Sequence, residues 1–375
     1  MANNNKHTGP NVPALRFPEF SGEWENKCLG DISENISSGR TKSTTKEGKY
    51  VLIGSTGVIG NTSDADYSGN LILVARVGAN AGLINYYSGD CGITDNTLII
   101  KPFEQEKSFC HYVYHYLKHC NLNQFVFGSG QPLITGGMLK RLPIRYGTTD
   151  EINKVSSLFD LLDARIEAQS KIIEELTTLR SALCEKCSTQ AGDIYDLSAI
   201  LQEVDERSTV VNQYQVLSST VKGIFSQKEY FNKDIASEDN KGYKVVRKGH
   251  IVLSPQNLWM GNINYNDRFD IGIVSPSYKV YSIKEGFNPI FVASLLRTKK
   301  ALYEYMLASE QGASIVRRNL NVEAFMSIRF RIPEIRQQDS LSMAIASINA
   351  KINNEKSVLE LLTKQKFSLL ENMFI

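Results

Sequence analysis

The chain contains a long internal repeat, and this repeat constrains its fold more than any other feature. Three segments of the first half return in the same order, 179, 180 and 186 positions later. Gly82–Tyr86 returns as Gly261–Tyr265, Gly92–Ile93 as Gly272–Ile273, and Leu162–Ile166 as Ile348–Ile352. Each copy runs from a strand-like segment punctuated by glycines into a long helical segment. A duplicated chain can form a pseudo-two-fold axis, which suits a ligand that is itself roughly two-fold, such as duplex DNA.

Composition limits the class of protein. A chain of 375 residues with 42% apolar and 22% charged residues is expected to form two to three soluble globular domains. No apolar run is long enough to span a bilayer, and the polar start from Met1 to Asn11 does not resemble a signal peptide. Six dispersed cysteines are typical of reduced thiols, so we expect a cytoplasmic protein. Because the net charge is only +2, a nucleic-acid binder of this composition must gather its cations on one face or use a partner's positive surface.

The hydrophobic pattern divides each copy into a β-rich part and a helical part. Short apolar runs bounded by glycines indicate strands at Val51–Ile53, Leu71–Val74 and Thr97–Ile100. From residue 151 the apolar residues recur in alternating steps of three and four, which is typical of a coiled-coil helix, here roughly 50 Å long. The predicted domains are residues 1–150, a first spacer helix at 151–190, a second globular domain at 191–333, and a second spacer helix at 334–375. We therefore predict an α+β fold class: two similar α/β domains separated by two long antiparallel coiled-coil helices, with pseudo-two-fold symmetry.

Both helical segments carry polar residues at matching positions of the apolar seam. Gln169 and Arg180 of the first correspond to Glu355 and Lys366 of the second. One interpretation is that these residues meet across an antiparallel pair and fix its register at a cost in stability. The other is that they lie at the edge of a seam shared with further apolar positions such as Leu158 and Leu161.

The sequence lacks the motifs of several common enzyme classes. It has no Walker loop, no Gly-x-Ser-x-Gly elbow, no His-Glu-x-x-His pair and no Asn/Asp-Pro-Pro-Tyr sequence of amino-methyltransferases. We therefore predict a non-catalytic binding protein that needs no cofactor. An enzyme with an unrecognised site stays as an alternative, and a metal assay on the purified protein would test it.

One cluster of histidines invites a metal interpretation. His111, His115 and His119 recur every four residues on a predicted helix and would share a face, as zinc ligands do. The repeat argues against a metal, because the second copy has no histidine at the equivalent positions. Those positions are Ile290, Ser294 and Thr298. Cys184 and Cys187 form a Cys-x-x-Cys pair without a second pair at zinc spacing. We predict no metal site, and interpret both groups as helix surface and helix packing.

Several loops combine cations that suit phosphates with polar side chains that suit base edges. The segment 38–46 carries three cations, and the glycine-bounded segment 54–57 can bring backbone amides close to a phosphate. The loops at 76–80 and 254–259 are counterparts in the two copies and differ in sequence, as two different recognition surfaces would. For any single residue, an ordinary solvated surface is the alternative. The candidate DNA-binding residues are Arg40, Lys42, Ser55, Thr56, Arg76, Asn80, Gln256, Asn257, Trp259, Arg317 and Arg318.

These features together resemble the specificity subunit of type I restriction-modification systems. The resemblance covers nearly the whole chain, and its order and duplication are more specific than its individual motifs. The residues that carry it are Leu15–Phe20 with Trp24, Gly48–Gly60, Ile93–Leu98, Trp259–Ile263, Gly272–Tyr278 and the two spacer helices. One departure is visible, because Gly147–Asp150 replaces the proline and Glu-Gln that usually open the first spacer, whereas Pro333 and Gln337–Gln338 partly keep them. This departure leaves the start of the first helix open.

The resemblance implies a specific role. Each target-recognition domain, 1–150 and 191–333, would read one half of a bipartite DNA sequence, and the helices would fix the unread spacer between the halves. The chain would have no catalysis of its own. It would recruit two modification subunits, which methylate adenine with S-adenosylmethionine, and two restriction subunits, which translocate and cut DNA, as in defence against phage. The alternative from another class is a coiled-coil scaffold that holds two protein partners without reading DNA.

Overall fold

The computed structural model describes residues 11–42, 48–125, 132–231, 239–311 and 318–375. The chain divides into two compact units. Unit 1 comprises Met1–Ser170 and Ser357–Ile375, and unit 2 comprises Lys171–Lys356. Each of the two long helices contributes one part to each unit. None of the helices in the described part of the chain combines the length and the hydropathy needed to cross a lipid bilayer.

Unit 1 is built around an antiparallel four-stranded sheet in the order β2-β8-β5-β6. A smaller sheet, in the order β4-β3-β7, pairs β3 antiparallel with β4 and parallel with β7, and β1 pairs with β9. The strands are β1 (Glu25–Cys28), β2 (Ser33–Ser38), β3 (Tyr50–Gly54), β4 (Gly57–Thr62), β5 (Asn70–Ala75), β6 (Ile84–Ser88), β7 (Cys91–Ile93), β8 (Thr97–Pro102) and β9 (Pro143–Tyr146). The three strands predicted from apolar runs are thus β3, β5 and β8, and the central strands β5 and β8 are buried almost throughout.

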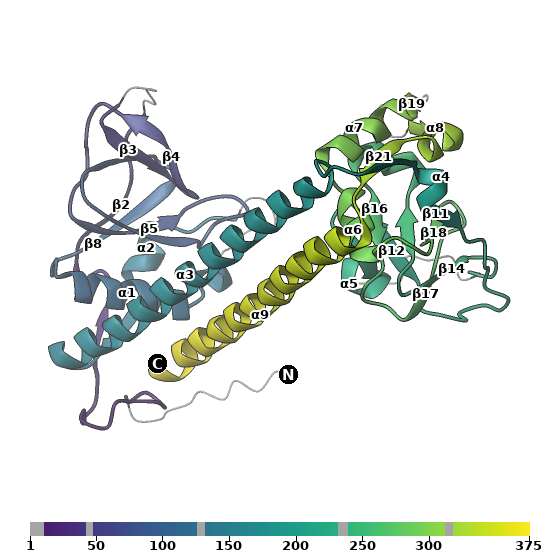
Figure 1. The fold of residues 1–375 in the computed structure, drawn as a ribbon. Helices are drawn as coiled ribbons and strands as arrows, with labels where there is room; N and C mark the ends of the chain where they lie inside the picture. The colour runs from purple at the N-terminus through teal and green to yellow at the C-terminus, as the bar shows by residue number, and fades with distance from the viewer. Residues whose placement is uncertain (1–10, 43–47, 126–131, 232–238, 312–317) are drawn as a thin grey trace. The chain divides into compact units, whose positions relative to one another are not determined.

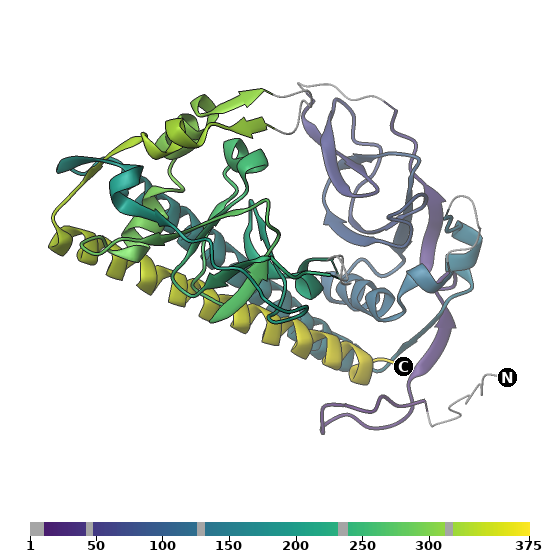
Figure 2. The same cartoon turned by 90° about the vertical axis from the view of Figure 1, so that its right-hand side faces the viewer.

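Helix α1 (Lys107–His119) lies between the sheet of unit 1 and the first part of the long helix α3 (Figures 1 and 2). Its residues Tyr112, Val113 and Tyr116 are buried in one apolar core with Ile72 and Ile100 of the sheet. The same core includes Ile152, Val155 and Phe159 of α3, and Phe374 directly after the second long helix. The described residues of the unit also form the short helices η1 (Leu122–Phe125) and α2 (Gly136–Lys140). A single core therefore ties the sheet, α1 and the ends of both long helices together.

Unit 2 repeats this plan. Its four-stranded sheet has the order β11-β18-β15-β16, and β10 pairs with β21 as β1 pairs with β9 in unit 1. Two-stranded ladders join β12 with β13, β14 with β17, and β19 with β20. The strands are β10 (Asp193–Asp196), β11 (Leu201–Glu203), β12 (Leu217–Thr220), β13 (Gly223–Ser226), β14 (Lys244–Arg247), β15 (Ile251–Leu253), β16 (Ile263–Tyr265), β17 (Ile271–Val274), β18 (Lys279–Ile283), β19 (Ser309–Gln311), β20 (Arg318–Leu320) and β21 (Arg329–Ile332). The helices are α4 (Leu197–Ile200), α5 (Gln227–Phe231), η2 (Pro255–Met260), α6 (Pro289–Leu295), α7 (Lys299–Leu307) and α8 (Val322–Met326).

The repeated glycines hold equivalent places for a steric reason. Gly82 and Gly261 have φ angles of 92° and 86°, a left-handed conformation that favours glycine, and each is followed closely by an edge strand, β6 or β16. Gly92 on β7 and Gly272 on β17 sit where a side chain does not fit. A Cβ atom would lie 2.8 Å from Thr41 Cγ2 in the first case and 2.5 Å from Leu217 Cδ1 in the second. Both matches of the sequence repeat therefore mark backbone positions that the fold requires twice.

The long helices are α3 (Thr149–Cys187) and α9 (Ile335–Met373), each of 39 residues. In unit 1 they run antiparallel, because Phe159 stacks on Phe374 at 5.4 Å while Asp163, one turn later on α3, pairs with Lys366, two turns earlier on α9. Lys366, a predicted seam position, therefore forms an ion pair with Asp163, which the seam pattern did not include. Leu161 is 70% exposed, so it is not part of the seam, whereas Leu158 packs partly buried against the core of unit 1.

The start of α3 is fixed by a buried carboxylate. Glu151 is 1% exposed and accepts hydrogen bonds from Arg16 Nε and Nη2, both at 2.7 Å, and from Trp24 Nε1 at 3.1 Å. Thr148 opens the helix, because its carbonyl accepts from the Ile152 N–H at 2.9 Å. The helix thus begins at Thr149 despite the unusual sequence before it, two residues before the predicted start. The opening motif that contains Arg16 and Trp24 anchors the N-terminal segment to α3.

Candidate nucleic-acid interface

In unit 1, strand topology brings the loops of the candidate residues to one end of the central sheet. The sheet is antiparallel, so β2 and β5 end where β6 and β8 begin: Ser38 pairs with Leu98, Ala75 with Thr97, and Val74 with Ile84. Arg40 and Lys42 follow β2, whereas Arg76 and Asn80 follow β5. These four side chains therefore belong to neighbouring loops at the same end of the sheet.

The β3–β4 hairpin reaches the same end of unit 1. Strand β3 runs parallel to β7, and the Thr94 N–H after β7 donates to the Ile53 carbonyl at 3.0 Å. Ser55 and Thr56 form the turn between β3 and β4, and Thr56 is exposed. All six candidate residues of the first copy thus lie on three loops next to the segment 94–96.

The cations of unit 1 differ in how firmly they are held. Arg40 and Lys42 are exposed, whereas Arg76 is half-buried, with its N–H bonded to the Asn96 carbonyl at 2.9 Å. Thr41 fixes the chain between the two exposed cations: its hydroxyl donates to Asp66 and accepts from the Ile93 N–H at 3.0 Å. Sequence reasoning missed Thr41, because its partners lie 25 and 52 residues away.

In unit 2, the counterpart loop forms the short helix η2 after β15. Gln256 is exposed, and Asn257 and Trp259 are half-buried. Arg318 on β20 places its guanidinium 4.5 Å from the centre of the Trp259 ring, a cation–π contact. The structure thus brings together two candidate residues that are 59 positions apart. Arg317 lies outside the described residues.

A hairpin tip of unit 2 corresponds to the β3–β4 turn of unit 1. Strands β12 and β13 are joined through Val221 and Lys222, which are both exposed. The residue before β12, Val216, forms a parallel bridge with Ile273 of β17, as β3 does with β7. Lys222 is therefore a cation at the place that Ser55 and Thr56 occupy in the first copy, and sequence reasoning did not identify it.

A polar network holds this hairpin tip against the sheet of unit 2. Arg297, which follows α6, donates to the Asn264 side chain and, at 3.0 Å, to the Val221 carbonyl. Asn264 donates in turn to the Ser219 hydroxyl at 2.8 Å, and Ser219 donates to Asn262 at 2.8 Å. Burial lowers the pKa of the Arg297 guanidinium below its ordinary value, yet an arginine stays charged. The network makes Arg297 a positioning residue for the loop that carries Lys222.

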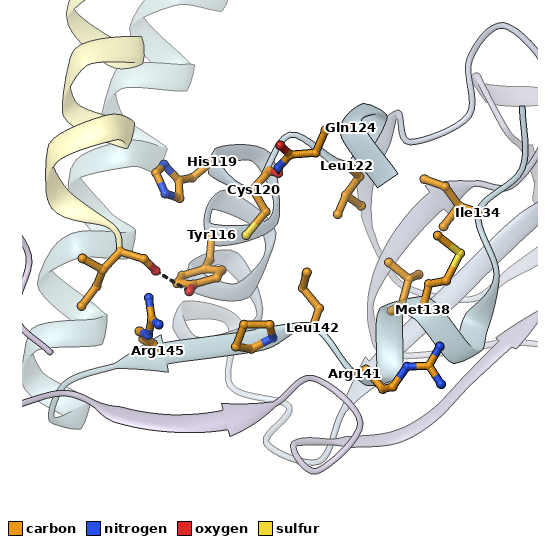
Figure 3. Close-up of a pocket in the computed structure, with 13 residues that line it drawn as sticks. Tyr116, His119, Cys120, Leu122, Gln124, Ile134, Met138, Arg141, Leu142 and Arg145 are labelled. Atoms are coloured by element: carbon orange, nitrogen blue, oxygen red, sulfur yellow. Dashed lines mark hydrogen bonds between the residues drawn. The ribbon is translucent and has the colours of Figure 1, made fainter. Parts of the chain in front are cut away.

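The three histidines of α1 lie in two different environments. His111 and His115 face Asp160 of α3 in unit 1. His119 instead lines a largely apolar cavity of 640 Å³ together with Leu142, Arg141 and Arg145 (Figure 3). In the same cavity the Tyr116 hydroxyl donates to the Ile375 carbonyl at 2.6 Å. The expectation that three histidines share one face therefore applies to two of them only.

The two cysteines at Cys-x-x-Cys spacing pack in the apolar core of unit 2. Cys187 is fully buried, and its thiol donates to the Leu183 carbonyl at 3.8 Å. Cys184 packs partly buried against the same core, and both thiols are free. Burial raises the pKa of the Cys187 thiol to about 12, which suppresses the thiolate that binds metals. This geometry agrees with helix packing.

Known proteins share this architecture. Residues 21–178 match the family model described as the type I restriction modification DNA specificity domain. Residues 21–178 therefore belong to the type I restriction modification DNA specificity domain family. The recognition of this family from the sequence is thus confirmed. A curated relative, the Escherichia coli type I restriction enzyme EcoprrI specificity subunit, is 24% identical over 186 residues. That match covers 48% of this chain and 45% of the relative, so less than half of the relative is matched.

Solved structures from type I restriction-modification systems share the fold over almost the whole chain. The S subunit of a type I restriction-modification system from M. genitalium superposes with a TM-score of 0.64 at 15% identity, covering 97% of this chain and 99% of that one. A second structure, from work on assembly and conformational transition of the type I system, has a TM-score of 0.54 at 12% identity and covers 94% and 97%. The predicted α+β fold class, with two similar domains and two long helices, is confirmed.

Proposed function

We propose that the chain reads DNA sequence for a type I restriction-modification complex, each recognition domain contacting one half of a bipartite site. The observation that carries this proposal is the grouping of candidate residues in each unit. In unit 1, cations and an amide lie on loops at one end of the central sheet. In unit 2, amides, an aromatic ring and cations lie on η2, β20 and the β12–β13 tip. Cations suit phosphates, and Arg, Asn and Gln suit base edges. The loops differ between the two copies while the strands correspond, so the two halves of the site would differ in sequence.

We further propose that residues 1–150 and 191–333 are the recognition domains and that the spacer helices set the unread gap between the half-sites. Two modification subunits would dock on this chain, followed by two restriction subunits, and these partners would supply methylation and cleavage. The chain itself would carry out no catalytic step. Its place of action would be the cytoplasm, where the DNA to be read lies.

Exposed apolar side chains on the long helices support docking of protein partners. They include Leu161 and Leu179 on α3 and Met343, Leu361 and Phe367 on α9, between 51% and 70% exposed. Covering such side chains with a partner is favourable, because it removes apolar surface from water. They are also the observation that favours the alternative function, a scaffold that binds proteins without reading DNA. The membership of residues 21–178 in a DNA specificity family favours DNA reading over this alternative.

Sequencing of methylated bases in a host with and without this chain tests the proposal. We expect one methylated adenine motif, made of two specified halves and a fixed unspecified gap, to disappear when the chain is deleted. Selection of duplexes by the purified chain with its modification subunits should return the same motif. An unchanged methylation pattern together with equal binding of all duplexes would support the scaffold instead.

A further inference from the structure

Two histidines of α1 and one aspartate of α3 converge in unit 1. His111 Nδ1 lies 2.6 Å and 2.7 Å from the two carboxylate oxygens of Asp160, and His115 Nε2 lies 3.3 Å from Oδ1 of the same group. The three candidate ligand atoms lie within 4.8 Å of one another. Two imidazole nitrogens and a carboxylate oxygen, held by two different helices, therefore form a compact set of metal-binding groups.

The surroundings hold this set in place and leave one side open. His115 is 1% exposed and His111 is 14% exposed, whereas Asp160 is 37% exposed and faces solvent on one side. The Tyr86 ring meets His111 edge-on at 4.2 Å, and Phe159 packs against His115 at 5.2 Å. Aromatic side chains restrict the two imidazoles to small movements, and a small ion can still enter past Asp160.

The second copy builds the equivalent joint without these groups. At the offsets of the repeat, the three positions become Ile290, Ser294 and Ala346. There, α6 is tied to α9 through Asn288, which donates to Asp339 at 2.7 Å and accepts from Ser342 at 2.7 Å. Packing a short helix on a long helix therefore does not need a His–His–Asp set. Since burial of two imidazoles beside a carboxylate costs desolvation, the set in unit 1 needs an explanation other than packing.

We propose that His111, His115 and Asp160 bind one divalent transition-metal ion of the zinc class, with water in the fourth position. Zinc takes histidine nitrogens at about 2.0–2.1 Å and carboxylate oxygens at about 2.0–2.2 Å in a tetrahedron, whose ligand atoms are then about 3.3 Å apart. The His115–Asp160 pair already has this separation. His111 has to withdraw by roughly 0.7 Å when an ion replaces the proton that it shares with Asp160.

The affinity of the site for a metal is limited, because the second ring nitrogen of each histidine lacks a hydrogen-bond acceptor within the described part of the chain. His111 Nε2 and His115 Nδ1 are buried and have no hydrogen-bond partner among the described residues. In the metal-bound state these nitrogens carry the imidazole protons, which zinc-binding histidines usually donate to an acceptor. We expect binding roughly 10–100-fold weaker than at a site with such acceptors. The bound ion links α1 to α3 and so stabilises unit 1 against unfolding.

Cobalt titration of the untagged, chelator-treated full-length chain tests the site directly. We expect one Co²⁺ per chain, visible d–d bands of a tetrahedral centre without a thiolate charge-transfer band, and displacement by Zn²⁺, which binds nitrogen and oxygen ligands more tightly. Zn²⁺ should also raise Tm. Because the readout uses no DNA, its outcome is independent of the proposed function.

Substitutions locate the ion. His115→Gln and Asp160→Asn should weaken Co²⁺ binding by at least roughly 100-fold, beyond the 10–100-fold cost of changes outside the ligand set. His119→Gln is the matched control, because His119 lies on the same helix but lines the separate cavity, and it should bind as the unaltered chain does. Asp160 is partly exposed, so Asp160→Asn, with folding checked by circular dichroism, keeps the test valid if His115→Gln unfolds. Absence of cobalt bands, or equal binding by a folded Asp160→Asn chain, would overturn the proposal.

Discussion

Arg76 offers the most direct test of base reading in unit 1. Its backbone is held on both sides, by the Asn96 carbonyl and by the Ile134 N–H, each at 2.9 Å, so its half-buried side chain leaves the sheet in a fixed direction. Arg76→Ala should cost ~1–3 kcal/mol of discrimination at the first half-site if the contact is bidentate, and less of the general DNA affinity. Competition binding with duplexes altered in either half measures this.

The matched control for Arg76 is the exposed cation Lys42. A phosphate contact carries no sequence information, so Lys42→Ala should weaken all duplexes alike and reduce the slope of affinity against salt by about 1. An unchanged base preference in Arg76→Ala would remove Arg76 from the reading surface.

A substitution of Arg297 tests whether the β12–β13 tip must be held in place for unit 2 to recognise its DNA sequence. Lysine keeps the charge but cannot bridge the Asn264 side chain and the Val221 carbonyl as the planar guanidinium does. Arg297→Lys should therefore reduce discrimination at the second half-site only. It should also lower the free energy of unfolding by about 1–3 kcal/mol, because the buried Asn264 side chain loses its partner. Binding selection and denaturant unfolding give the two readouts. Equal effects on both half-sites would mean that Arg297 acts through overall stability.

At the residue scale, the candidate side chains on the loops were easier to predict from the sequence than the residues that hold those loops in place. Arg40, Arg76 and Trp259 stand out because cations and aromatics beside glycines are typical of recognition loops. Their supports do not stand out, since Thr41 and Arg297 act through partners distant in the chain. Asp160 was not predicted either, because its histidine partners are distant in the chain. A single aspartate on a long helix is also typical of a solvent-exposed helix surface.

At the scale of elements, the buried Glu151 ties the N-terminal segment to α3. Glu151→Ala should lower the free energy of unfolding by about 3 kcal/mol, because Arg16 and Trp24 lose a shared acceptor that is almost fully buried. Denaturant unfolding measures this loss. The exposed pair of Glu19 and Lys154 joins the same two segments, so Glu19→Ala is the control and should change stability little. Comparable losses in both variants would contradict this reading.

The long helices were predictable as elements because their apolar residues keep one period over most of their length. The period gave both helices to within two residues at their starts, and Ile152, Val155 and Phe159 are buried as the pattern requires. The contacts between the helices were less predictable. Lys366 pairs with Asp163, and no feature of one helix alone indicates which residue of the other lies opposite.

At the scale of the whole molecule, the repeat predicts modular reading. Exchange of residues 1–150 for the equivalent part of a relative with a different site should change the first half of the recognised sequence and leave the second half and the gap unchanged. The reason is that the candidate loops of unit 1 are positioned by strands of unit 1 alone. Methylated-base sequencing of the exchanged chain reads out both halves. A change in both halves would refute modular reading.

The length of the unread gap between the half-sites tests whether the long helices set the distance between the two recognition domains. Seven residues inserted after Gln169 of α3 and seven after Lys356 of α9 add about 10.5 Å of helix to each. Both insertions lie within one residue of the boundary between the units, so they leave the cores of both units in place. At 3.4 Å per base pair, the unread gap should lengthen by about three base pairs with both half-sites unchanged. A heptad keeps the apolar seam in phase, whereas a five-residue insertion turns it away from its partner and should abolish binding. An unaltered gap in the heptad variant would show that another part of the complex sets the distance.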